Sequence, residues 1–346
     1  MADITAPDLA APSLTAPPPE HSAEAALALA ERHFGKTGVL ERLTSERDLN
    51  FRLTTGSGES FVLKIGNAAE PAAVSEFQTA ALAHVAARDP GLPVPRTIAA
   101  RDGRTCVPLP GGEVLRLLSW LDGQPMHRAA SGPGLRASLG AIAARLTRAL
   151  DGFDHPEAGH ELLWDIRNAA RLRPFLPTVS DPDLRSLATL WLDRFEGDIA
   201  PALPTLPWQV VHADLNPHNL LTDPSGRAVT GILDFGDMVR TARICDLAVA
   251  ASYHADPDRP LATLAEVVTA WHAVLPLTGD EARLMADLVA MRMVLTVVIA
   301  SWRAGLYPDN APYILRNVPA SGAGLAALSE VGRDAARARI ASCLED

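Results

Sequence analysis

The spacing of hydrophobic positions divides the chain into two parts. The first third contains both helix-like and strand-like spacing. Apolar residues about 3.6 positions apart predict helices over residues 21–34 and 73–88. Short runs of β-branched and aromatic residues predict strands. Two of them, 49–54 and 60–65, flank a Gly-Ser-Gly turn and form a predicted hairpin. Further strands are expected over 39–43, 97–100, 105–108 and 113–118, so this part should form a small sheet with one main helix packed on it.

The spacing of hydrophobic positions changes after residues 119–125, whose sequence Ser-Trp-Leu-Asp-Gly-Gln-Pro indicates a hinge. Beyond it helical periodicity dominates, and only residues 209–235 break into short strands and a polar loop. The predicted helices of this second part run over 135–150, 161–172, 182–199, 244–253, 261–274, 279–304 and 323–344.

The chain has 346 residues, which exceeds the size of one small core and fits two lobes. Its first residues are rich in Ala, Pro and Thr, a composition typical of a disordered tail. The predicted class is therefore α+β and bilobal. Its expected parts are a tail at 1–20, a sheet-containing lobe at 21–118, a hinge at 119–125 and a larger, mostly helical lobe at 126–346.

Charge and composition narrow the possible partners. Lys plus Arg number 31 against 41 Asp plus Glu, and no basic run is present, so we expect no nucleic-acid partner. The most apolar stretch, 284–300, carries Asp287 and Arg292 and predicts a buried helix rather than a membrane span. The sequence does not indicate an oligomeric state.

Cysteine usage and the N-terminus indicate a cytoplasmic protein. Cys106, Cys245 and Cys343 are far apart, with no spacing of a zinc site or disulfide framework. Isolated thiols are typical of a reducing compartment. Residues 1–20 lack the basic start and apolar core of a signal peptide.

Two segments carry the candidate chemistry. In the first, an apolar run ends at His212 and a polar loop follows, with Asp214 and Asn219 five positions apart in VVHADLNPHNLL. In the second, an apolar run ends at Asp234 in TGILDFGDM. Phosphoryl transfer needs a carboxylate beside the attacking hydroxyl and hard oxygen ligands that place Mg²⁺ on the triphosphate. One Asp for the hydroxyl, with an Asn and a second Asp for the metal, supplies this set.

The pattern His-x-Asp-x-x-x-x-Asn followed by Asp-Phe-Gly resembles the protein-kinase-like superfamily. With no arginine after His212, it looks like the aminoglycoside phosphotransferase and choline kinase family. The segments SERDLNF at 45–51 and LKIGNAAEP at 63–71 are similar to the hydroxylysine kinase branch of that family. The resemblance covers about residues 25–340. It implies a protein-kinase-like fold with Asp214 as catalytic base and Asn219 and Asp234 as magnesium ligands.

The resemblance also implies a set of nucleotide contacts in the first lobe. Lys64, in the apolar run 61–65, should reach the α- and β-phosphates and be held by Glu76 of the following helix. Taken alone, Lys64 would be an ordinary charge on an edge strand. The loop that should cover the phosphates lacks the glycines of protein kinases, so backbone N–H groups, Ser45 or Asn50 are the candidates there. Ser45 and Asn50 are equally typical of simple turns.

The remaining roles near the loop follow from residue chemistry. An aspartate with its usual pKa of about 3.9 is a weak base, so Asp214 should mainly orient the hydroxyl and take the proton late. His212 should be structural, and Asp246 should hydrogen-bond the backbone of the catalytic loop. Asp237 is a candidate for contact with metal or a substrate amine, or for a simple cap.

Substrate residues are harder to assign. Asp165 and Asp237 are candidates for a cationic amine. Arg292 lies in an apolar helix and needs a partner, which is either a substrate carboxylate or a structural salt bridge. The expected activity is Mg²⁺-dependent transfer from ATP or GTP to the hydroxyl of a small amino alcohol, most like hydroxylysine. The alternatives are a kinase of an aminoglycoside, choline, ethanolamine or homoserine, or a silent pseudokinase that regulates a partner.

Overall fold

The computed structural model describes residues 17–45 and 47–345, which fall into two compact units. Most of the tail expected at 1–20 lies outside the described residues. The chain passes from the first unit to the second between Asp122 and Gly123, inside the segment expected to be a hinge. Two later segments, His155–Gly159 and Gly231–Gly236, group with the first unit, whereas the sequence placed everything after 125 in the second lobe.

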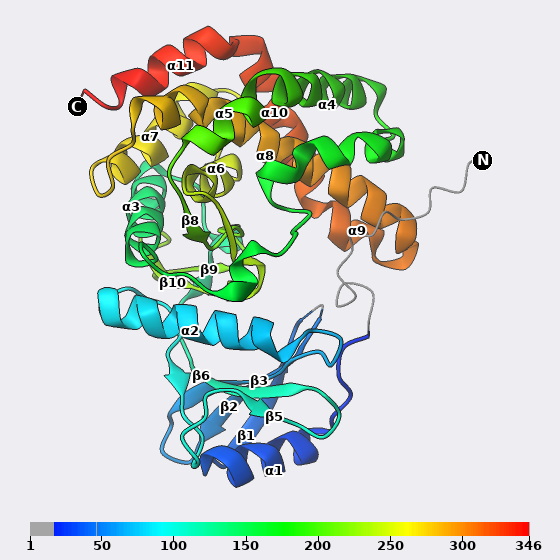
Figure 1. Ribbon diagram of the computed structural model, residues 1–346, viewed down its shortest axis with the longest axis vertical. Coiled ribbons are helices and arrows are strands. Elements are labelled where there is room, and N and C mark those ends of the chain that lie inside the picture. Colours follow the sequence, from blue (N-terminus) through cyan, green and yellow to red (C-terminus); the bar gives the residue numbers. More distant parts are fainter. Residues whose placement is uncertain (1–16, 46, 346) are drawn as a thin grey trace. The chain divides into compact units, whose positions relative to one another are not determined.

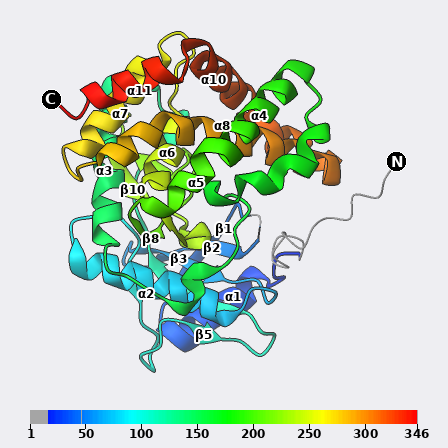
Figure 2. The ribbon, with the colours of Figure 1, turned by 45° about the horizontal axis from the view of Figure 1, so that its top comes forward.

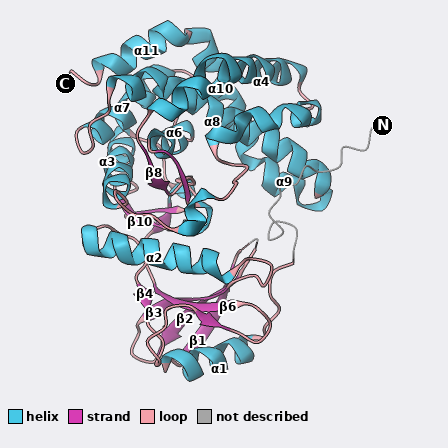
Figure 3. Cartoon of the chain, in the orientation of Figure 1, coloured by secondary structure: helices cyan, strands magenta, loops and turns pink. Residues whose placement is uncertain are grey.

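The first unit is built on an antiparallel sheet with a helix on each face (Figure 1). The strand order is β1-β2-β3-β6-β4, and β5 pairs with β6. Figure 3 shows the sheet in magenta between α1 and α2. The bounds are α1 Ala23–Phe34, β1 Gly38–Leu43, β2 Leu49–Thr55, β3 Ser60–Ile65, α2 Ala72–Arg88, β4 Thr97–Ile98, β5 Val107–Pro108 and β6 Val114–Ser119.

Successive side chains of each strand point to opposite faces of this sheet, so the two faces carry different residues. Side chains such as Phe51 and Leu63 are buried with α1 in one apolar cluster. The register aligns Asn50, Lys64 and Arg116 across β2, β3 and β6 on the other face. Arg116 donates to the Gln78 side chain of α2 at 2.8 Å. The sheet face beneath α2 therefore carries a row of polar side chains that includes Lys64.

The second unit is mostly helical and packs around α8, Gly279–Leu306 (Figure 2). Helices α4, α6, α10 and α11 contact it. By length and hydropathy α8 passes the test for a membrane span, as core helices of soluble proteins also do, but 94% of its most apolar window is buried inside the protein. Its Asp287 is bound by Arg333 and Arg337. The helices of this unit are α3 Pro133–Ala149, α4 Pro182–Arg194, α5 Ala200–Ala202, α6 Ile244–Ser252, α7 Pro260–His272, α9 Ala311–Ile314, α10 Val318–Val331 and α11 Arg333–Ser342.

Short strands support the loops that carry the candidate chemistry. A two-stranded antiparallel sheet joins β8, Trp208–Val211, to β11, Val239–Ala242. A three-stranded sheet contains β7 Gln124–Pro125, β9 Leu220–Thr222 and β10 Val229–Ile232. The loop with Asp214 and Asn219 runs from the end of β8 to the start of β9, so both of its ends are anchored in strands.

The α+β class is confirmed, and two predicted helices differ in detail. The helix expected over 323–344 is two helices, because Gly332 has a φ of 86° that ends α10. The helix expected over 161–172 is instead a 3₁₀ segment, η4, Ile166–Thr178. Pro174 and Pro177 lie inside it, and proline removes an N–H donor that a continuous α-helix needs.

Candidate active site

The catalytic loop begins directly after β8, where its backbone donates hydrogen bonds to Asp246. This buried residue lies in the first turn of α6. Its two carboxylate oxygens accept N–H groups from His212 at 3.0 Å and Ala213 at 2.7 Å. This confirms the structural role predicted for Asp246. The ring of His212 also belongs to the loop, because its Nδ1 accepts the N–H of Asp214 at 3.3 Å.

Both candidate motifs contain a residue with a strained backbone. Ala213, directly before Asp214, has a φ of 62°, and Asp234 has a φ of 55°. In the described chain these are the non-glycine residues with positive φ. Such conformations cost about 1–3 kcal/mol and persist where surrounding contacts enforce them, often at functional sites. For Ala213, the enforcing contact is the Asp246 carboxylate.

The carboxylate of Asp214 is held from two sides. Oδ2 accepts from Nδ2 of Asn219 at 2.7 Å and from Nδ2 of Asn216 at 2.8 Å. Oδ1 accepts from Nη2 of Arg292 at 3.1 Å. The Asn219 amide nitrogen also donates to the Asp214 carbonyl, so its own amide oxygen is turned away from these bonds. The loop thus brings together the two residues that the sequence proposed as base and metal ligand.

Burial raises the pKa of the Asp214 carboxyl, and the nearby charge of Asp237 raises it further. The Arg292 guanidinium and the Asn216 hydrogen bond oppose these effects without cancelling them. The usual pKa expected from the sequence is therefore corrected upward. A carboxylate with a raised pKa is a stronger base, because its conjugate acid holds the proton more tightly.

The contacts of Arg292 decide between the two partners that the sequence left open, a substrate carboxylate and a structural salt bridge. It is 2% exposed, and its Nη2 also donates to the Tyr253 hydroxyl at 3.2 Å while Nη1 donates to the Trp164 carbonyl. Its partner carboxylate is that of Asp214. Arg292 is therefore part of an internal ion pair, and its contact with a substrate carboxylate is not what the structure shows.

The two other substrate candidates differ in their surroundings. Asp165 is 2% exposed, caps η4 by accepting the N–H of Arg167, and binds the Arg167 side chain at 2.7 Å. Thr241 donates to the same carboxylate. These internal contacts speak against Asp165 as an amine ligand. Asp237 lies close enough to Asp214 to raise its pKa, so it stays a candidate beside the loop.

In the first unit, Lys64 pairs with a different carboxylate from the one expected. Its Nζ lies 2.6 Å from Oδ2 of Asp48, and both side chains are largely buried. Glu76 of α2 is exposed. Burial alone would raise the pKa of Asp48, but the charge and hydrogen bond of Lys64 and the N–H of Asn67 outweigh it and hold the pKa below its usual value. The assignment of Glu76 as the partner of Lys64 is corrected to Asp48.

The loop between β1 and β2 is fixed by side chains instead of glycines. Ser45 Oγ accepts the N–H of Asp48 at 3.3 Å, which is a turn contact. Asn67 donates its N–H to Asp48 Oδ1 and its amide to the Arg47 carbonyl. Asn50 differs: its Oδ1 is buried and has no hydrogen-bond partner among residues 17–45 and 47–345. A buried unpaired oxygen beside Lys64 is an observation that a ligand donor would explain.

Arg47 of this loop lies beside the Asp-Phe-Gly segment. A Cβ added at Gly236 would lie 3.2 Å from Arg47 Nη2 and 3.0 Å from Asp234 Oδ1. The guanidinium and the carboxylate therefore border the same space, and a side chain at 236 would fill it. Arg47 was missed in the sequence, although its segment was singled out, because arginine has no place in the glycine-rich pattern used for comparison.

The donor groups fit a magnesium ion better than a transition metal. Asn219 and Asp234 offer an amide oxygen and a carboxylate, which are hard ligands of the kind Mg²⁺ takes while keeping several waters. Within the described ranges, no group of three His, Cys, Asp or Glu side chains is arranged to hold a metal. The two residues lie on different units, and each is described within its own.

Comparison with known proteins shows which family and which relatives the chain is similar to. The model of the phosphotransferase enzyme family, APH, matches residues 39–285. The hydroxylysine kinase of Bos taurus is 28% identical over 344 residues, covering 92% of this chain and 92% of that protein. The hydroxylysine kinase of Mus musculus is 26% identical, covering 90% of each.

Solved structures share the fold at lower sequence identity. A microcompartment-associated aminopropanol kinase has a TM-score of 0.67 at 18% identity, covering 88% of this chain and 95% of that one. Together with the sheet of the first unit and the helices of the second, this likeness confirms the expected protein-kinase-like fold class.

Proposed function

The chain belongs to the phosphotransferase enzyme family and is a small-molecule kinase, and from this premise we propose that it moves the γ-phosphoryl group of ATP or GTP to the hydroxyl of a small amino alcohol. Hydroxylysine is the acceptor we favour, since two relatives that match nine-tenths of the chain are hydroxylysine kinases. We propose Mg²⁺ as the metal that accompanies the nucleotide.

One observation carries this proposal: the loop in which Asp246 holds Ala213 strained and Asp214 presents its carboxylate beside Asn219. An acceptor hydroxyl that replaces one donor on Asp214 would be oriented by the carboxylate and pass its proton to it. The raised pKa of Asp214 supports that role. Mg²⁺, when bound, supplies charge neutralisation on the phosphates, and the Asn219 amide oxygen and Asp234 carboxylate are its proposed protein ligands.

The first unit contributes two positively charged side chains to the proposed triphosphate site. Lys64 is the proposed partner of the α- and β-phosphates, and it would exchange Asp48 for phosphate oxygens. Arg47 adds a guanidinium beside Asp234, and it offers the planar, charged donors that suit phosphate oxygens. Lys64 on β3 and Arg47 in the loop between β1 and β2 are therefore the proposed phosphate contacts of a lobe whose loop lacks glycines. Asn50 Oδ1 is a proposed acceptor for a nucleotide donor.

Transfer of labelled phosphate tests the proposal. ATP and GTP would each be supplied with Mg²⁺ to hydroxylysine, homoserine, choline, ethanolamine and kanamycin. We expect hydroxylysine to be phosphorylated fastest. We expect Asp214→Ala to lower the rate by about 10²–10⁴-fold while nucleotide binding is retained, because this is the usual contribution of a general-base group. Asn216→Ala, which removes a different donor from the same carboxylate, is the matched control and should retain most activity.

Other results would redirect the assignment. A different acceptor in first place would keep the chemistry and replace the substrate. Tight nucleotide binding without transfer to any acceptor would favour the regulatory pseudokinase, and full activity in Asp214→Ala would remove that residue from the mechanism. We also propose a cytoplasmic location, supported by the three free thiols of Cys106, Cys245 and Cys343 and testable by cell fractionation.

A further inference from the structure

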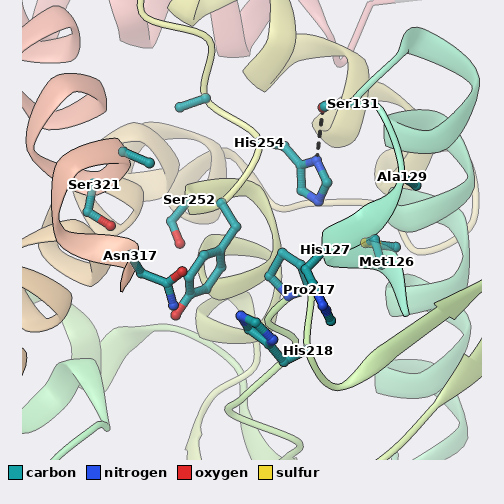
Figure 4. Close-up of a pocket in the computed structure, with 13 residues that line it drawn as sticks. Met126, His127, Ala129, Ser131, Pro217, His218, Ser252, His254, Asn317 and Ser321 are labelled. Carbon is teal, nitrogen blue, oxygen red and sulfur yellow. Dashed lines mark hydrogen bonds between the residues drawn. The ribbon is translucent and has the colours of Figure 1, made fainter. Parts of the chain in front are cut away.

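A pocket of about 210 Å³ opens beside the catalytic loop within the second unit (Figure 4). It is lined by the segment after β7, by Pro217 and His218 of the loop, by residues 252–255 at the end of α6, and by the start of α10. All of its lining residues belong to the described chain, and none of them is Asp or Glu. The pocket is connected to the reaction site through Tyr253, whose hydroxyl accepts from the arginine that binds Asp214.

His254 presents an unsatisfied polar atom at this pocket. The residue is 7% exposed, and its Nδ1 lies 3.1 Å from the Ser131 hydroxyl. Nε2 is buried and has no hydrogen-bond partner in the part of the chain that the structure describes. Figure 4 shows the edge of the ring opposite Ser131 turned toward the side of Pro217 and His127. A buried polar atom without a partner costs about 1–3 kcal/mol, so it calls for a ligand.

The neighbours of Ser131 decide whether Nε2 donates or accepts. Arg136 donates from Nη1 to Ser131 Oγ at 3.1 Å, and Glu266 holds Arg136 at 2.7 Å. Because Oγ accepts from the Arg136 cation, its own proton can be donated to Nδ1 of His254, and this is the arrangement we infer. The imidazole then carries its proton on Nε2. Burial and the charge of Arg136 lower the pKa of His254 to about 4, so the ring is neutral and Nε2–H is a donor at neutral pH.

A second histidine is arranged in a similar way. Arg316 donates from Nε to His218 Nε2 at 3.2 Å, which leaves the proton of the neutral ring on Nδ1. The ring of His127 stacks on it at 4.3 Å. Each histidine therefore has an arginine behind it, one directly and one through Ser131. Glu266 balances the charge of Arg136, so what the pocket offers is neutral N–H donors with no acidic side chain in the lining, which suits an anion better than an ammonium group.

We propose that this pocket binds the carboxylate of an amino-acid acceptor, with His254 Nε2–H as the donor and the arginine-backed His218 beside it. The inference rests on the proposed kinase function and defines its substrate class. Pockets for drug-sized ligands measure about 300–1,000 Å³, so a 210 Å³ pocket fits a small amino acid better than a multi-ring aminoglycoside. It also reassigns the carboxylate role once considered for Arg292, which is already bound to Asp214.

The test compares acceptors that differ by one carboxylate. Phosphate transfer would be measured for hydroxylysine against its decarboxylated diamine, and for homoserine against aminopropanol. We expect the wild-type kcat/KM to favour the acid in at least one pair by about 10- to 100-fold, the value of a hydrogen bond to a charged group. In His254→Phe this preference should fall toward unity through a higher KM for the acid. The rate with the carboxylate-free partner and the KM for the nucleotide should stay unchanged.

A second variant protects the test against misfolding. Ser131→Ala leaves the buried ring in place and removes the hydroxyl that contacts Nδ1 and accepts from Arg136, so it should raise the KM for the acid less than His254→Phe does. Equal use of both members of each pair by the wild type would overturn the carboxylate site and leave the kinase function intact. An unchanged preference in His254→Phe would overturn it as well. Transfer to none of the four would overturn the proposed function itself.

Discussion

Replacing Asp246 by asparagine should release the catalytic loop without touching the groups that contact substrates. Asp246 is fully buried, and its carboxylate accepts two backbone N–H groups, from His212 and Ala213. An asparagine keeps one oxygen for one of them and turns an N–H₂ group toward the other. We therefore expect Asp246→Asn to lower kcat while the nucleotide binds as before, because Lys64 and Asp48 lie in the other unit.

The number of hydrogen bonds that Asp246 accepts sets the expected loss of kcat. A hydrogen bond to a charged group contributes about 1.5–3 kcal/mol, and weakening two of them costs about 2–4 kcal/mol in loop stability. If this cost falls entirely on the population of the reactive loop, kcat drops by roughly 30- to 800-fold, which is an upper bound. The strain at Ala213, with its φ of 62°, adds to the drive toward a relaxed loop.

If the strained backbone of Ala213 drives the loss of kcat in Asp246→Asn, then relieving that strain should recover part of the lost kcat. Glycine takes a positive φ without the penalty, so Ala213→Gly in the Asp246→Asn background should recover about 1–2 kcal/mol, or roughly 5- to 30-fold in kcat. Steady-state kinetics would give kcat, and titration calorimetry the nucleotide Kd. Ala213→Gly alone should stay close to wild type.

Two outcomes would refute the reasoning. If Asp246→Asn has wild-type kcat, the two hydrogen bonds do not hold the loop in its reactive form. If kcat falls and nucleotide affinity falls with it, and Ala213→Gly recovers neither, then the substitution has disrupted the fold and the strained residue has no special part.

Three further predictions address the other charged groups. Lys64→Met should lower the unfolding free energy by about 3 kcal/mol, because it strands the buried Asp48 carboxylate, and should weaken nucleotide binding; adding Asp48→Asn should restore denaturant stability but not affinity. Asp234→Asn should raise the Mg²⁺ concentration for half-maximal rate about tenfold or more, and an unchanged Mg²⁺ titration would contradict its role as a ligand. Because the pKa of His254 is about 4 in the fold and about 6.5 unfolded, the unfolded chain binds the extra proton between these values. Stability should therefore fall by up to about 3 kcal/mol as pH drops from 6.5 to 4, and urea melts of His254→Gln should lack this loss.

Groups close in sequence were predictable because a short loop limits how far they can separate. Asp214 and Asn219 are five positions apart between two strands, so the motif placed them in one loop, whereas their hydrogen bond is seen only in the structure. The backbone role of Asp246 was also predictable, since the loop leaves N–H groups that need an acceptor. The alternating patterns of the first third and the helical periodicity of the rest determined the two-part organisation for the same local reason.

Contacts between groups far apart in sequence depended on how the elements pack. Nothing in the order of residues says that Lys64 meets Asp48 from the preceding loop instead of Glu76 from the following helix, because both carboxylates lie within reach along the chain. Arg292 is 78 positions from Asp214, and only the packing of α8 against the catalytic loop brings them together. The proton of His254 is assigned by Ser131 and Arg136, which lie more than a hundred positions earlier. Sequence thus determined which chemical groups each loop offers, whereas tertiary packing decided which partner each charge has, because burial makes a charge depend on whichever opposite group the fold places beside it.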